Sequence, residues 1–184
     1  MSSAGAAVYS ISNRRLETKT EELDKEFGYE EIEDMYVDVP PPPANRVEVS
    51  MSQERNSRGN PILDVDVYVN NMLISNFKAL SGRTNTQNLD RNVANNASPS
   101  PTGSYIILPE TQGFHPETGG VFLPYEPTFE TQRSELGFHI DPSWGKDNGE
   151  DGTVGCLGFK TLEEYNNFVK LIEDNGIYNL DINY

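Results

Sequence analysis

Cysteine and basic residues are scarce in this chain of 184 residues. Cys156 is the only cysteine, which excludes an intrachain disulfide and a multi-cysteine zinc site. Lysine and arginine number 14 against 29 aspartates and glutamates, which gives a formal net charge of −15. A nucleic-acid binder generally needs a basic face to neutralise phosphates, so we expect no nucleic-acid partner.

Long apolar runs are also missing. None is longer than the run at residues 105–108, whereas a membrane-spanning helix needs about 20 apolar residues. We therefore expect no membrane span. The N-terminal sequence MSSAGAAVYSISNRR lacks a basic start followed by an apolar stretch, so we expect no secretory signal peptide and synthesis in the cytoplasm.

The composition changes near residue 46. Residues 1–46 carry many acidic and few apolar side chains, and the four prolines at 40–43 are expected to form a stiff, extended spacer. This segment is interpreted as an acidic N-terminal arm, either a solvated tail or a docking arm that a partner assembly orders. Residues 47–184 form the expected folded domain.

Alternating apolar and polar residues predict strands beyond the spacer. The alternation is clear at 47–51 and at 65–69, and Asn70-Asn71 can turn the chain into a second strand of a hairpin at 72–82. Residues 85–101 are polar and are expected to form a long surface loop. Further short strands are expected at 103–108, 120–123, 137–140 and 178–184.

One amphipathic helix is expected after these strands. It begins at Thr161, where Thr161 and Glu164 form a T-x-x-E capping box, and Gly176 can end it in a left-handed cap. The apolar residues on one face of this helix are Leu162, Tyr165, Phe168, Val169 and Ile172. The expected fold class is therefore mostly β with one helix.

Cys156 and His139 are the candidate reactive residues. Glycines flank Cys156, and their backbone freedom would let N–H groups converge on a developing oxyanion. His139 lies in the apolar strand 137–140, where an imidazole can take the thiol proton and leave a nucleophilic thiolate. The alternative for Cys156 is an ordinary small, buried side chain. His115 lies in a loop-like segment and is the weaker histidine.

The loop 141–152 follows His139 in the sequence. Asp141 would lie on the same face as His139 if the strand continues, and would then orient the imidazole. Trp144 is interpreted as a lid over a bound peptide or, alternatively, as a packing residue. The acidic residues of the loop do not follow EF-hand spacing, and the chain has no H-E-x-x-H motif, so no metal site is expected.

The order of these motifs resembles the L,D-transpeptidase (YkuD-type) catalytic domain. The signature of that family is a histidine, a loop, and then Ser or Thr, His, Gly and Cys. His139, Thr153, Gly155 and Cys156 match this pattern, and Val154 replaces its second histidine. Leu80-Ser81-Gly82 and the segment 98–106 also match. The resemblance covers about residues 47–184 and is closest to the compact, signal-less branch that includes secreted antibacterial effectors.

The resemblance implies a β-sandwich-like fold and a cysteine enzyme that acts on peptidoglycan stem peptides. Cys156 would be the nucleophile and His139 the base and later the acid, with D-alanine leaving from the diamino acid and no cofactor needed. The N–H groups of Gly155 and Cys156 would face the oxyanion, and Thr153 matches the Ser/Thr of the motif. Gly158 stands where many members have an arginine, and the alternative is an inactive structural or docking protein that keeps the fold.

Without a signal peptide, such an enzyme would need a machine to carry it to the cell wall. We therefore expect wall cleavage rather than cross-linking. We also expect the arm of residues 1–46 to dock onto a phage virion or tail, or onto a secretion system.

Overall fold

The computed structural model describes residues 41–109 and 118–184. The chain divides into two compact units, Met1–Pro41 and Pro42–Tyr184. The folded unit therefore begins a few residues before the predicted boundary at 46. The predicted acidic arm up to residue 40 lies outside the described residues, and so does His115.

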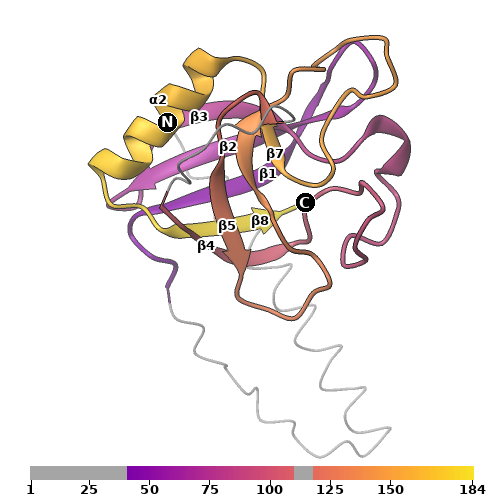
Figure 1. Ribbon diagram of the computed structural model, residues 1–184. Helices are drawn as coiled ribbons and strands as arrows, with labels where there is room; N and C mark the ends of the chain where they lie inside the picture. The colour runs from indigo at the N-terminus through magenta and orange to yellow at the C-terminus, as the bar shows by residue number, and fades with distance from the viewer. Residues whose placement is uncertain (1–40, 110–117) are drawn as a thin grey trace, which may run out of the picture. The chain divides into compact units, whose positions relative to one another are not determined.

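Eight strands of the second unit form one closed barrel (Figure 1). Their order around the barrel is β1-β2-β3-β7-β6-β5-β4-β8. Neighbouring strands run antiparallel except for the pairs β6–β7 and β1–β8, which are parallel. The strands are β1 (Arg46–Arg55), β2 (Pro61–Val69), β3 (Met72–Leu80), β4 (Gly103–Ile107), β5 (Leu123–Pro127), β6 (Gly137–Ile140), β7 (Leu157–Phe159) and β8 (Asn179–Asn183). The mostly β class is confirmed.

The hairpin of β2 and β3 follows the predicted pattern. Val65 and Val67 are fully buried, and they pair with Val49 and Val47 of β1 across an antiparallel register. Asn70 and Asn71 adopt positive φ angles of 51° and 62°. This is the left-handed conformation that a two-residue hairpin turn requires. Local sequence therefore determines this corner of the barrel.

Two predicted details are wrong. The strand expected at 120–123 begins only at Leu123, because residues 118–120 form a turn in which Gly119 and Gly120 have positive φ. The predicted apolar helix face includes Leu162, but this side chain is 50% exposed. Leu162 is the first helical residue, and the core begins one turn later at Tyr165.

The helix α2 (Leu162–Asp174) packs against β6 and β7. Thr161 is its N-cap and forms the predicted capping box with Glu164. At its end Gly176 has a φ of +57°, and its N–H donates to the carbonyl of Glu173. Both helix boundaries therefore agree with the sequence prediction.

Aromatic side chains fix α2 to the strands that carry the candidate residues. The ring centroid of Phe168 lies 4.6 Å from that of Phe138 and 5.1 Å from that of Phe159. All three side chains are fully buried, and burial of each contributes about 2 kcal/mol. The positions of β6 and β7 are thereby set by the core. In the part of the chain described, no helix is long and apolar enough to cross a membrane.

Candidate functional site

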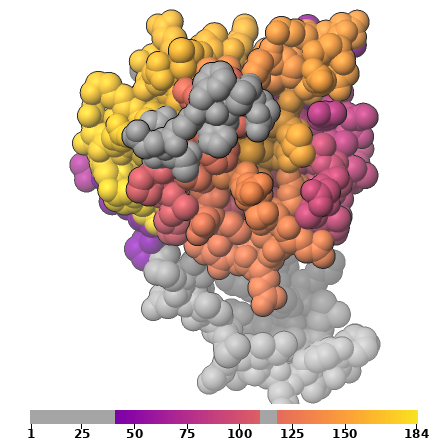
Figure 2. All heavy atoms as spheres, in the orientation of Figure 1, coloured from indigo at the N-terminus to yellow at the C-terminus, as the bar shows by residue number. Residues whose placement is uncertain are grey.

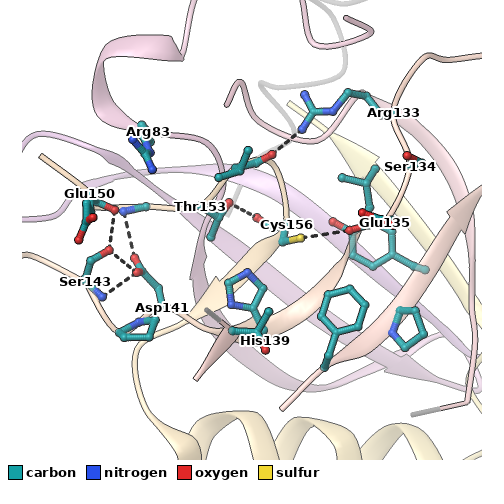
Figure 3. A pocket seen from close by; sticks show the side chains of 18 of the residues that line it. Arg83, Arg133, Ser134, Glu135, His139, Asp141, Ser143, Glu150, Thr153 and Cys156 are labelled. Carbon is teal, nitrogen blue, oxygen red and sulfur yellow. Dashed lines mark hydrogen bonds between the residues drawn. The ribbon is translucent and has the colours of Figure 1, made fainter. Parts of the chain in front are cut away.

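β6 and β7 place His139 and Cys156 in one groove. Phe138 pairs with Leu157 in the parallel register, and both side chains point into the core. Because side chains alternate along a strand, His139 points to the opposite face of the sheet, and Cys156 lies in the bend that directly precedes β7. Both residues line a groove of about 1270 Å³. Figure 3 shows the His139 ring next to the Cys156 side chain.

Two loops form one side of this groove. Residues 83–97 follow β3, and the loop 141–152 follows β6; the two are joined by a β-bridge between Arg83 and Gly152. Figure 2 shows them next to each other on the surface, in magenta and in orange. Segments far apart in sequence therefore enclose the cysteine and the histidine.

The imidazole of His139 is buried, with 6% of the residue exposed. Its Nδ1 lies 2.6 Å from the carbonyl oxygen of Ile140. A carbonyl can only accept, so Nδ1 carries the proton and Nε2 has a free lone pair. Burial lowers the pKa of His139 below its usual value. The ring is therefore neutral at pH 7 and can accept a proton.

The thiol of Cys156 is protonated in the same state. Its Sγ donates to the carbonyl of Glu135 at 3.7 Å. Burial raises the pKa of the thiol to about 11, although the backbone N–H of Gly137 and the charge of Arg133 act in the opposite direction. The free protein thus holds a thiol that points to a carbonyl beside a neutral imidazole, rather than a thiolate–imidazolium pair.

Thiol alkylation should report this protonation state. We expect the rate of Cys156 alkylation by iodoacetamide to be slow at pH 7 and to rise about tenfold per pH unit up to about pH 10, because only the thiolate reacts. The rate is measured by intact mass as a function of pH. A plateau reached below pH 8 would show instead that the thiolate forms in the free protein.

The Thr153 hydroxyl organises the turn that leads into Cys156. It accepts hydrogen bonds from the N–H groups of Gly82 (3.2 Å) and Gly155 (3.1 Å), and it donates to the carbonyl of Cys156 (2.6 Å). The N–H of Gly155 is therefore committed to Thr153. Gly155 is also not among the described residues that line the groove, so the expectation that its N–H faces an oxyanion is wrong.

Two serines hold the same turn from the other side. The hydroxyls of Ser81 and Ser100 both donate to the carbonyl of Gly155. The Ser100 hydroxyl also lies 2.7 Å from the phenol oxygen of Tyr125. Ser81 and Ser100 belong to the segments that carry the family resemblance. In the structure these segments meet at the turn that presents Cys156.

The sequence pattern does not mark Arg133 as a residue of the site. Its guanidinium donates to the carbonyl of Val154 (2.8 Å) and to the hydroxyl of Ser98 (2.8 Å), and the residue is buried. A β-carbon at position 155 would lie 1.7 Å from Nη2 of Arg133. The arginine therefore supports the turn before Cys156. It comes from the loop between β5 and β6, where neither spacing nor periodicity marks it.

Asp141 does not contact the imidazole, so its expected orienting role is wrong. Its carboxylate accepts from the N–H and hydroxyl of Ser143 (2.9 and 2.6 Å) and from the N–H of Gly152 (3.0 Å). It pins both ends of the loop 141–152. Burial raises the pKa of Asp141, and these hydrogen bonds act against that rise. The Ile140 carbonyl orients His139 instead.

Two other expected positions differ from the prediction. Trp144 is half-buried and is not among the described residues that line the groove, although Pro142, Ser143 and Lys146 are. The lid role therefore has no support. A β-carbon at Gly158 would lie 2.8 Å from Thr153 and 2.9 Å from Asp141, so position 158 has no room for an arginine.

No metal cluster is found in the parts of the chain that the structure describes: no three His, Cys, Asp or Glu side chains there are placed to hold an ion. Comparison of the chain with models of protein families and with curated proteins gives no match in either case. The resemblance to L,D-transpeptidases therefore rests on the motifs themselves.

Proposed function

We propose that this protein is a cysteine-dependent enzyme of peptidoglycan stem peptides, of the L,D-carboxypeptidase or L,D-transpeptidase type. The observation that carries the proposal is that His139 of β6 and Cys156, which directly precedes β7, line one groove. The Nε2 lone pair of His139 is free to accept a proton, and the groove is large enough for a short peptide. No cofactor takes part in the proposed reaction.

The proposed reaction has two steps. Cys156 Sγ attacks the carbonyl of the diamino acid while its proton passes to Nε2 of His139, and the imidazolium then protonates the amine of the departing D-alanine. The thioester is next attacked by water, whose proton returns to His139, or by an acceptor amine. Since the resting thiol points to Glu135, bound substrate must turn the thiol toward the imidazole.

The test is incubation of the full chain with muropeptides that carry tetrapeptide stems. Release of D-alanine with trimmed tripeptide stems is expected, because we propose cleavage as the main outcome. New cross-linked dimers in excess over trimmed stems would contradict cleavage. Absence of both products with several stem types would contradict the enzymatic proposal.

A second candidate is an inactive protein that keeps the fold as part of an assembly. It is favoured by the thiol pKa of about 11 and by the commitment of the Gly155 N–H to Thr153. Both features weaken nucleophile activation in the free state. In that case the groove would bind peptide without any covalent adduct on Cys156.

We also propose that the arm of residues 1–46 docks the protein onto a delivery assembly, a phage virion or tail ahead of a secretion system. Deletion of residues 1–41 is expected to leave a folded domain, because residues 42–184 form a compact unit. The truncated protein should melt cooperatively with unchanged thiol reactivity, but should no longer co-purify with the assembly. Retained co-purification would place the docking surface on residues 42–184.

A further inference from the structure

Arg83 lies at one end of the groove that contains Cys156 (Figure 3). Its Nε is buried and has no hydrogen-bond partner among the residues that the structure describes. Among residues 41–109 and 118–184, no carboxylate lies within ion-pair distance of its guanidinium. An unpaired, partly desolvated guanidinium is unfavourable in a protein that has no ligand for it.

The backbone of Arg83 is held firmly. Its N–H donates to the carbonyl of Ala97 (3.1 Å), and its own carbonyl accepts from Thr86 and Gln87. The β-bridge to Gly152 fixes it from the side of the 141–152 loop. The guanidinium is thus presented from a rigid support, which reduces the entropy lost when it binds a ligand.

The other two cations of the groove differ from Arg83. The guanidinium of Arg133 already donates hydrogen bonds to the carbonyl of Val154 and to the hydroxyl of Ser98. Lys146 is exposed on the 141–152 loop, where water solvates its ammonium group and weakens any ion pair. Arg83 is therefore the cation best placed to bind an anion inside the groove.

We propose that Arg83 is a specificity-determining residue that binds a carboxylate of the substrate while Cys156 attacks. This inference rests on the proposed function. A carboxylate can accept two parallel hydrogen bonds from a guanidinium, which gives a bidentate ion pair. A stem peptide offers two such groups, the C-terminal carboxylate of the D-residue and the side-chain carboxylate of a diaminopimelate residue. Binding either one would fix the scissile bond relative to the thiol.

The first test needs no stem peptide. Cys156 is alkylated at one pH with anionic iodoacetate and with neutral iodoacetamide, and the ratio of the two rates is measured. The thiolate fraction cancels in this ratio. Arg83→Gln is expected to lower the iodoacetate-to-iodoacetamide ratio about fivefold, because it removes a positive charge from the groove that Cys156 lines. Arg83→Lys should keep most of the wild-type ratio, because it keeps the positive charge.

Arg55→Gln is the matched control, since it removes the same charge from a side chain that donates to the Gly59 carbonyl and does not line the groove among the described residues. Its ratio should equal that of the wild type. Melting curves confirm that each variant is folded. An equal ratio in wild type and Arg83→Gln would overturn the proposal that Arg83 attracts an anion, whatever the activity of the protein.

The second test uses binding of peptides to the Cys156→Ala variant by calorimetry. Four stems are compared: tetrapeptide acid or amide, each with diaminopimelate or lysine at the third position. If the C-terminal carboxylate is the ligand, the amides bind about tenfold more weakly and Arg83→Gln removes the difference. If the side-chain carboxylate is the ligand, the lysine stems bind about tenfold more weakly than the diaminopimelate stems, and Arg83→Gln removes that difference. Equal effects of Arg83→Gln on all four stems would contradict carboxylate recognition.

Discussion

Replacing Cys156 with alanine is expected to lower D-alanine release from tetrapeptide stems by at least about a thousandfold. The thiol is the protein group that forms a bond to the substrate carbonyl in the proposed reaction. His139 can then still accept a proton, but it has no nucleophile to activate. The measurement is release of D-alanine by chromatography, with the full chain and the variant at equal concentration.

The control for this variant is its stability. Cys156 is partly exposed, and the hydrogen bond that its thiol donates to the Glu135 carbonyl is long, so the alanine variant should unfold within about 1 kcal/mol of the wild type. An active wild type and an equally active alanine variant would exclude Cys156 as the nucleophile.

Replacing Gly155 with alanine is expected to lower the free energy of unfolding by about 3 to 5 kcal/mol. Gly155 has a φ of +118°, and an added β-carbon would lie 1.7 Å from Nη2 of Arg133. The buried guanidinium must then move away from Ser98 and the Val154 carbonyl. Chemical denaturation measures the loss, and alkylation of Cys156 should change with it.

Gly59→Ala is the matched control for this second variant. Gly59 also has a positive φ, +84°, but a β-carbon there meets no atom within 4 Å. Its expected cost is therefore only the backbone strain of about 1 to 2 kcal/mol. Equal losses for the two alanine variants would mean that Arg133 does not hold the turn in the way described.

Short-range patterns in the sequence predict much of the fold. The hairpin turn at Asn70 follows from two residues that tolerate positive φ, and the limits of α2 follow from Thr161 and Gly176. β7 was missed because it has only three residues, Leu157–Phe159, too few for a period to appear. Closure of the barrel depends on the β1–β8 pairing, which no local pattern encodes.

In the candidate site too, some residues follow from local sequence patterns and others only from tertiary packing. His139 and Cys156 could be found because their residue types and order carry chemistry. Arg133 and Arg83 could not, since each reaches the groove from a polar loop and is selected only by tertiary packing. Asp141 lines the groove as strand alternation predicts, but its carboxylate bonds to Ser143 and Gly152 of its own loop instead of the imidazole, and alternation does not predict these partners.

The most direct test of the proposed function is the mass of the protein during reaction. The full chain is mixed with excess tetrapeptide stem, quenched in acid within seconds and measured by intact mass spectrometry, with peptide mapping of any adduct. The expected result is a transient thioester on Cys156 whose added mass equals the stem peptide minus D-alanine and whose population decays as water attacks it. Release of D-alanine without any adduct on Cys156 at any time, or an adduct that also forms on the Cys156→Ala variant, would contradict the proposal.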